Sequence, residues 1–263
     1  MTLALNFVTL FATVFIFGIC IGSFLNVCIY RIPAGVSIVT PGSTCPKCST
    51  KLAFYCNIPI FSYLLLKGRC KYCKTPISIR YPIIEWLTGI VAVSLLLKFG
   101  LTIQMVFWFV FICTLIVISF IDFDHQIIPD VISLPGIIIF ASSFFFLPEM
   151  TIKQVLFGIL FGGGSLTLVA VLYYLLRKQE GMGGGDIKLL AMIGAAIGPK
   201  GVLFTIFCGS LVGTIVGSVM ILITQKSGLK LNIPFGPYLS LGAVLYIFYG
   251  EPIISWYLGF ITG

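Results

Sequence analysis

Residues 103–121 read IQMVFWFVFICTLIVISFI, nineteen consecutive residues without a charged side chain. A transmembrane α-helix needs about 20 predominantly apolar residues to cross the roughly 30 Å hydrocarbon core of a bilayer. This run has that length, so we predict that it crosses a membrane as a helix.

Similar apolar runs occur along the whole chain, at 3–28, 82–98, 131–147, 154–176, 201–223 and 237–260, with a shorter run at 187–198. Of the 263 residues, 59% are hydrophobic and 9% are charged, against roughly 25% charged in soluble domains. We read the first run as a retained helix because it lacks a charged n-region and a cleavage site. The sequence therefore predicts an all-α polytopic membrane protein, a bundle of about eight transmembrane helices of which one is short.

The net charge of +8 follows the expected membrane topology. If the N-terminus is outside, thirteen of the sixteen Lys and Arg residues fall on one side, in segments 31–80, 177–188 and 226–230. The other three are Lys98, Lys153 and Lys200. The positive-inside rule makes the richer side cytoplasmic. The charge is thus explained by topology, and we expect a bilayer but no nucleic acid as a partner.

The segment 31–80 is the one long polar stretch and carries two CxxC pairs, CPKC at 45–48 and CKYC at 70–73. Two such pairs at this separation are typical of a structural zinc site with four thiolate ligands, Cys45, Cys48, Cys70 and Cys73. Four free thiols or two disulfides are the alternatives, and a reducing cytoplasm disfavours disulfides. We predict a small zinc-binding cytoplasmic domain between the first two helices.

Small residues recur four positions apart within the apolar runs, at Gly18 and Gly22, at Gly158 and Gly162, and at Gly209, Gly213 and Gly217. This spacing lets helix backbones approach closely in lipid. It predicts a compact bundle and carries no information about chemistry.

Two groups of acids stand where spans meet the cytoplasmic side. Asp122 and Asp124 follow the 103–121 run, and Asp186 precedes the short run at 187–198. Ionisable residues at such places are functional candidates because burying them is costly. We expect Asp186 and either Asp122 or Asp124 to meet at one face. Two neighbouring carboxyl groups share one proton, which suits general acid–base catalysis.

The remaining candidates have simpler interpretations. Asp130 follows Pro129 and begins an apolar run, as a helix N-cap does. Glu85, one turn into the second span, is within reach of a pairing with Arg80 or Arg31. Glu180 suits a surface ion pair in the polar loop after the 154–176 run.

The glycine-rich segment EGMGGGD at 180–186 precedes that short run. It is neither a P-loop nor a GxGxxG motif, and its acid would repel a phosphate. Twelve helical residues from 187 to 198 rise only about 18 Å, less than the bilayer core. The loop therefore either dips below the membrane surface or precedes a helix that does not cross fully. Either arrangement places Asp186 within the membrane in a polar cavity.

The sequence resembles the type IV prepilin peptidases, which belong to the GxGD class of intramembrane aspartic proteases. The resemblance runs along nearly the whole chain and follows motifs in family order: GSFLNVCIYRIP at 22–33, the two CxxC pairs, SIRYPIIEWLTG at 78–89, IDFDHQIIPDVISLP at 121–135, GMGGGDIKLLAMIGA at 181–195 and IPFGPYLSLG at 233–242.

This resemblance implies an aspartic endopeptidase that removes the basic leader from type IV prepilins and from the pseudopilins of type II secretion. It places the enzyme in the bacterial inner membrane with its site facing the cytoplasm. By motif position, the catalytic acids are Asp122 and Asp186, and Asp124 is not the match. Bifunctional members also N-methylate the new N-terminus with S-adenosylmethionine, for which no binding residue is recognisable here.

The resemblance divides the chain into a first transmembrane helix (1–30), a zinc-binding domain that includes the methyltransferase region (31–80) and a multi-helix peptidase domain (81–263). Within the peptidase domain, helix polarity makes Asp186 the initial base, because it begins a helix, and Asp122 the initial acid, because it ends one. Zinc is expected to be structural, since four thiolates leave no position for water.

Two other classes of function fit part of the pattern. A multi-pass transporter coupled to protons or cations would also use intramembrane acids and broken helices. A non-catalytic assembly scaffold would use the helix bundle and the zinc domain as interaction surfaces. Both acids lie at one end of the bundle and no inverted repeat is visible, which disfavours the transporter. The scaffold leaves the acid pair unexplained.

Overall fold

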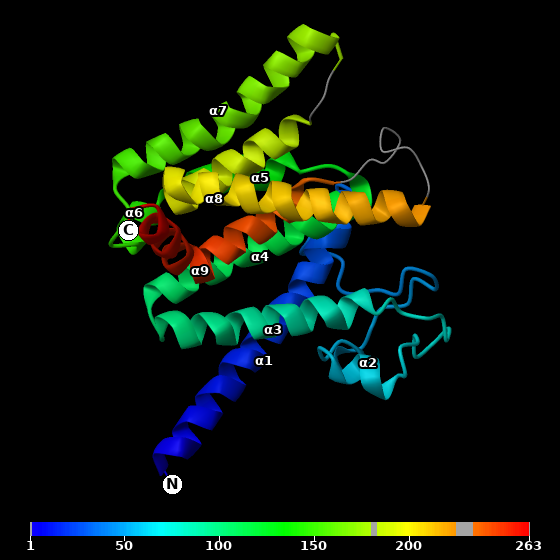
Figure 1. Cartoon of the computed structure of the whole chain (residues 1–263). Helices are drawn as coiled ribbons and strands as arrows, with labels where there is room; N and C mark the ends of the chain where they lie inside the picture. Colours follow the sequence, from blue (N-terminus) through cyan, green and yellow to red (C-terminus); the bar gives the residue numbers. More distant parts are fainter. Residues whose placement is uncertain (1, 180–182, 225–233, 263) are drawn as a thin grey trace. The chain divides into compact units, whose positions relative to one another are not determined.

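A computed structural model describes residues 2–179, 183–224 and 234–262. Every named element of secondary structure in this part of the chain is a helix (Figure 1). The elements are α1 (Thr2–Arg31), η1 (Phe54–Cys56), α2 (Phe61–Leu65), α3 (Arg80–Phe99), α4 (Ile103–His125), α5 (Asp130–Ala141), α6 (Ser143–Phe146), α7 (Ile152–Arg177), α8 (Gly184–Thr224) and α9 (Gly236–Thr262). Six of these, α1, α3, α4, α7, α8 and α9, are long and apolar enough to cross a membrane.

The expected all-helical membrane fold is confirmed, and the described part of the chain contains six long apolar helices when α8 is taken as one. The runs at 187–198 and 201–223 both lie in α8 but form two helical segments, because Gly198 has the non-helical angles φ 70° and ψ −178° and Pro199 follows it. Figure 1 shows the chain folding back between these two segments, so the sequence correctly separates the two runs. The run at 131–147 divides into the twelve-residue α5 and the four-residue α6.

The chain divides into two compact units, residues 1–113 and 114–263, and α4 continues from one into the other. In the first unit, α1 packs against α3. A Cβ on Gly22 would lie 2.7 Å from the Cα of Glu85, and one on Gly18 would lie 2.8 Å from the Cα of Gly89. These two glycines therefore permit the close backbone contact that their spacing predicts.

In the second unit, the first half of α8 is the core, with residues 189–197 buried. Helices α5, α7 and α9 pack against α8, and Figure 1 shows α7 running along it. Gly162 of α7 lies against the backbone of Leu190, while Gly209 of α8 lies against the backbone of Tyr238 in α9. The buried short run is therefore the element around which this unit is assembled.

Helix α7 begins at a capping box formed by Thr151 and Gln154. The Thr151 hydroxyl accepts a hydrogen bond from the backbone N–H of Gln154 at 3.3 Å, and the Gln154 side chain accepts one from the N–H of Thr151 at 2.8 Å. This capping box satisfies two N–H groups that the first turn of the helix leaves without partners. It fixes where α7 begins after the preceding turn.

Replacing Gly158 by valine is expected to lower the stability of the second unit by about 1–3 kcal/mol, the usual effect of overpacking. A Cβ there would lie 2.8 Å from the carbonyl carbon of Gly194 and 2.9 Å from the Cα of Gly198. Gly164→Val is the matched control, because it lies in the same helix with no described atom within 4 Å. Thermal unfolding in detergent tests the difference, and equal melting temperatures for both variants would contradict it.

Candidate active site and cysteine cluster

Asp122 lies in the last turn of α4 and is buried, with 5% of its surface exposed. Its Oδ2 atom accepts a hydrogen bond of 3.0 Å from the backbone N–H of Gly236, the first residue of α9. A Cβ on Gly236 would lie 2.7 Å from the same oxygen. The carboxyl group is therefore held by a close backbone approach, and a side chain at position 236 would force it to move.

Asp186 lies in the first turn of α8 and is half-buried. Its carboxyl group is close enough to that of Asp122 for the two charges to repel each other. The structure thus brings together the end of one helix and the start of another, 64 residues apart in sequence. This juxtaposition is what the positions of the two acids predict.

Ile128 links the two aspartate-bearing segments. A Cβ on Gly185 would lie 2.9 Å from the Cβ of Ile128, and a Cβ on Gly236 would lie 3.4 Å from its Cδ1. The side chain of Ile128 therefore packs against both Gly185, which precedes Asp186, and Gly236, which binds Asp122. Residues 180–182 of the glycine-rich segment, including Glu180, lie outside the described residues, as do Lys226 and Lys230.

The interpretation of Asp130 as an N-cap is wrong. Pro129 occupies the N-cap position of α5, and Asp130 is the first residue of that helix. Both oxygens of Asp130 accept hydrogen bonds from the ammonium group of Lys188, at 2.6 and 2.8 Å. Lys188 follows Asp186 by two residues, so this ion pair ties the start of α8 to the start of α5.

Glu85 and His125 are the other two candidate ionisable groups. Glu85 is buried, and its carboxyl group accepts a hydrogen bond of 2.8 Å from the backbone N–H of Ile60 and another from the Ser23 hydroxyl. It therefore anchors the polar loop to α1 and α3 instead of pairing with Arg80 or Arg31. His125 is exposed at the end of α4.

The two CxxC pairs of the first unit form two matching backbone turns, which we call the first knuckle (residues 44–51) and the second knuckle (residues 69–76). In the first, the N–H of Cys45 donates to the carbonyl of Thr50 at 3.0 Å; in the second, the N–H of Cys70 donates to the carbonyl of Thr75 at 2.8 Å. Antiparallel bridges join Thr44 to Lys51 and Arg69 to Pro76. Equal spacing in the sequence thus produces the same turn twice.

The four sulfur atoms of the cysteine cluster lie within 4.8 Å of one another. The Sγ atoms of Cys45 and Cys73 are 3.8 Å apart, far longer than the roughly 2.0 Å of a disulfide. Tetrahedral zinc with Zn–S bonds of about 2.3 Å separates its sulfur ligands by about 3.8 Å. The cluster therefore has the donor set and the dimensions of a metal site, and two disulfides are excluded because all four cysteines are free.

Two of these thiols lie beside hydroxyl groups that favour the thiolate. The Thr75 side chain hydrogen-bonds Cys73 at 3.2 Å and lowers the pKa of that thiol to about 6. Thr50, at the same place in the first knuckle, lowers the pKa of Cys48. A thiolate is the form that binds a metal. The threonine two residues after each CxxC pair therefore favours metal binding by the cluster.

Gly236 and Ile128 were not identifiable as site residues from the sequence. Both lie within quoted motifs, IDFDHQIIPDVISLP and IPFGPYLSLG, but nothing in the sequence pairs them with the two aspartates. The one available signal is the position of Gly236 immediately before the last apolar run, 237–260.

Six apolar helices, two neighbouring aspartates at helix ends and a four-cysteine cluster define a class of protein: a multi-pass helical membrane protein with an acidic site. Two family models match the chain, the Bacterial Peptidase A24 N-terminal domain over residues 16–99 and the Type IV leader peptidase family over residues 109–218. The chain belongs to the type IV leader peptidase family.

Curated relatives support this membership over most of the chain, and each is named a prepilin leader peptidase/N-methyltransferase. The protein from Pseudomonas aeruginosa is 37% identical over 92% of this chain and 91% of its own. That from Legionella pneumophila is 33% identical over 95% of both chains. A Myxococcus xanthus relative is 39% identical over 81% of this chain, which spans 64% of that longer protein. No solved structure matches the chain.

Proposed function

We propose that this protein is a bifunctional enzyme of the inner membrane. It removes the basic leader from type IV prepilins and pseudopilins at the cytoplasmic face, and it then N-methylates the new N-terminal residue. The observation that carries the peptidase half is the approach of Asp122 to Asp186 within one unit. The names of the relatives support both halves. The transporter alternative has no support from the family.

The aspartate pair suits hydrolysis of a peptide bond by a general acid and a general base. The ionised carboxylate takes a proton from water, which attacks the carbonyl carbon, and the protonated carboxyl group donates to the leaving amine. We assign the base to Asp186, in the first turn of α8, and the acid to Asp122, in the last turn of α4. The helix dipole favours a negative charge at the first site and disfavours it at the second.

The cysteine cluster suits a structural zinc ion. All four ligand positions would be taken by thiolates, so the metal would offer no place for water or substrate. Zinc would hold the two knuckles together, and thereby the 31–80 domain between α1 and α3. Its contribution to either reaction would be through the shape of that domain.

The decisive experiment incubates the purified protein with a prepilin in detergent, with and without S-adenosylmethionine. Product masses separate the two reactions, because cleavage removes the leader and methylation adds one methyl group to the mature chain. We expect cleavage under both conditions and methylation only with the donor. Intact prepilin under both conditions would end the peptidase proposal.

Gly185→Ala is expected to lower the rate of prepilin cleavage roughly 10- to 100-fold, the cost of displacing a catalytic group by about 1 Å. Its Cβ would lie 2.9 Å from the Cβ of Ile128, an atom next to the backbone that cannot swing away. Gly184→Ala is the matched control, since no described atom lies within 4 Å of a Cβ there. Initial rates at saturating prepilin test this, and a control variant as impaired as Gly185→Ala would contradict the steric explanation.

A further inference from the structure

The polar stretch between α1 and α3 contains a run of residues that reads FYCNIPIFSYLLL, which we call the apolar segment (residues 54–66). It includes η1 and α2 and carries no charged side chain. Four of its large apolar side chains are each at least 63% exposed, namely Phe54, Phe61, Leu64 and Leu65. Exposed apolar side chains gathered in one short stretch mark a surface that meets lipid or another protein.

The orientation of α2 is the reverse of that expected for a helix in water. Its one buried residue is polar, Ser62. The Ser62 hydroxyl donates a hydrogen bond of 2.7 Å to the carbonyl of Tyr55 and accepts one of 2.9 Å from the N–H of Ile58. A surface helix of a soluble protein buries its apolar face and exposes its polar one. The outward face of α2, with Phe61 and Leu65, therefore suits apolar surroundings.

The depth of α2 follows from a hydrogen bond to α3. The 20 residues of α3 rise about 30 Å, which matches the roughly 30 Å of hydrocarbon in a bilayer. Glu85 lies five residues after Arg80, the first residue of α3, and hence about 7.5 Å along the helix from its start. The N–H of Ile60, the residue before α2, donates to Glu85 at 2.8 Å. Helix α2 therefore begins at the depth of about 5–10 Å that is typical of amphipathic helices at membrane surfaces.

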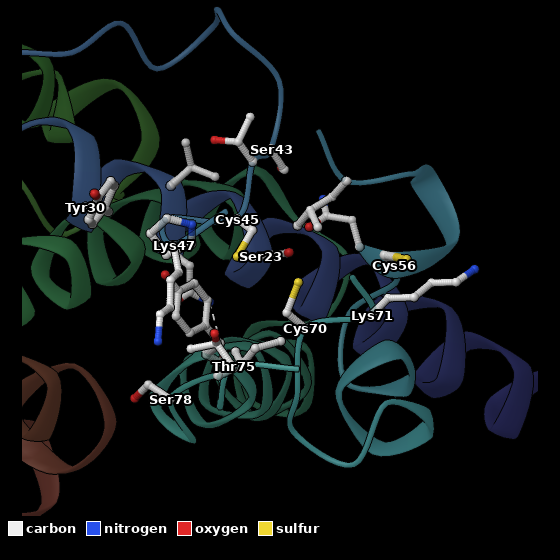
Figure 2. A pocket seen from close by; sticks show the side chains of 18 of the residues that line it. Ser23, Tyr30, Ser43, Cys45, Lys47, Cys56, Cys70, Lys71, Thr75 and Ser78 are labelled. Carbon is white, nitrogen blue, oxygen red and sulfur yellow. Dashed lines mark hydrogen bonds between the residues drawn. The ribbon is translucent and has the colours of Figure 1, made fainter. Parts of the chain in front are cut away.

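Basic residues follow the apolar segment directly. Segment 31–80 contains eight Lys and Arg residues and no Asp or Glu. Four of the eight, all exposed, form what we call the basic cluster: Lys67, Arg69, Lys71 and Lys74. The ammonium group of Lys71 hydrogen-bonds the Tyr55 hydroxyl at 2.9 Å and lies 4.4 Å from the centre of the Tyr55 ring. Figure 2 shows Lys71 next to Cys56. The basic cluster thus borders the apolar segment, and such a cluster attracts anionic lipid headgroups.

We propose that the apolar segment lies in the bilayer surface and that the basic cluster beside it binds anionic phospholipids. The apolar side chains enter the boundary between headgroups and acyl chains. The stems of Lys67 and Arg69 lie along this boundary and their charged ends reach the phosphate groups. A lipid fits this surface better than a prepilin does, because the basic leader of that proposed substrate would be repelled by the basic cluster. This membrane contact does not depend on which reaction the protein catalyses.

The first test measures whether the apolar segment touches lipid. Photoreactive benzoylphenylalanine in place of Leu65 is introduced into the full-length protein, in nanodiscs of equal parts phosphatidylcholine and phosphatidylglycerol. Illumination is expected to produce a phospholipid adduct, which mass spectrometry detects. The same photoreactive residue in place of Lys51 is the matched control, since Lys51 is exposed in the first knuckle outside the apolar segment. We expect a several-fold lower yield of adduct there.

Two results of this test would overturn the proposal. No lipid adduct at Leu65, or equal yields at Leu65 and Lys51, would mean that the apolar segment does not lie in the bilayer surface. An adduct of Leu65 with added prepilin that replaces the lipid adduct would assign the surface to the substrate instead.

The second test measures the preference for anionic headgroups. Each base at a membrane surface strengthens binding roughly fivefold, so the double variant Lys67→Gln/Arg69→Gln is expected to lower binding of phosphatidylglycerol relative to phosphatidylcholine roughly 25-fold. Native mass spectrometry of the lipids that stay bound measures this ratio. The double variant Lys98→Gln/Lys153→Gln is the matched control, because it removes the same charge from exposed bases outside segment 31–80. Equal melting temperatures in detergent show that both variants are folded. An unchanged ratio in the first variant, or an equal loss in the control, would contradict binding by the basic cluster.

Discussion

Asparagine in place of either Asp122 or Asp186 is expected to slow prepilin cleavage by roughly 10²- to 10⁴-fold, the contribution of one positioned general acid or base. The substitution keeps the shape of the side chain but replaces the ionisable carboxyl group with an amide that can neither carry the negative charge nor transfer the proton. Asp122 is buried and hydrogen-bonded to Gly236, so the amide still fits. Each variant therefore removes chemistry while leaving the packing of α4 and α8 in place.

Asp124→Asn is the control for this experiment. Asp124 is exposed, two residues beyond Asp122 on the same helix, and the sequence alone left it as a competitor. We expect the Asp124→Asn protein to cleave prepilin at the wild-type rate. A variant of Asp124 as slow as the Asp122 variant, or an Asp122→Asn protein with full activity, would show that a different pair of acids performs the reaction.

The two reactions also provide an internal control. If cleavage and methylation use separate sites, Asp186→Asn should still methylate a synthetic mature pilin that needs no cleavage. Retained methylation with lost cleavage shows that the variant is folded. Loss of both would indicate that Asp186 supports the structure, and the catalytic assignment would then fail.

Much of the fold follows from hydrophobicity because a membrane span is a local property. A run such as 103–121 needs no partner to specify a helix, since lipid leaves its backbone no other way to satisfy its hydrogen bonds. The boundary at Gly198 and Pro199 is local as well. Glycine adopts the positive φ of 70° found at position 198 without steric cost, and the two runs on either side form separate helical segments within α8. The run at 131–147 is less predictable, because the sequence does not show that it divides into α5 and α6.

The candidate site could also be predicted only in part, because some of its features follow from local sequence and others from contacts between distant residues. Topology predicts that Asp122 and Asp186 approach each other, since both lie where chain segments reach the same side. It does not predict that Gly236 binds Asp122 or that Ile128 touches Gly185, because those contacts depend on how three helices pack. Asp130 illustrates the converse. Its local sequence resembles a cap, but its carboxylate binds Lys188, 58 residues away.

Removal of the metal is expected to have the second large effect. Serine at Cys73 or at Cys48 should reduce bound zinc from one equivalent to nearly none, because a hydroxyl is a poor ligand for a thiolate site. Structural zinc stabilises isolated zinc-finger peptides by about 10–16 kcal/mol. The polar segment has only short helices of its own, η1 and α2, so little else holds the two knuckles together.

Zinc analysis, together with limited proteolysis of residues 31–80, measures this effect. Cys20→Ser is the control, since Cys20 is an exposed residue of α1 far along the sequence from the cluster. We expect chelation to match the cluster variants in both readouts and to impair methylation more than cleavage, because the cluster lies in the 31–80 segment to which we assign methylation, while the aspartates belong to the other unit. A zinc-free protein with wild-type protease resistance and both activities would mean that the cluster neither holds a structural metal nor shapes that segment.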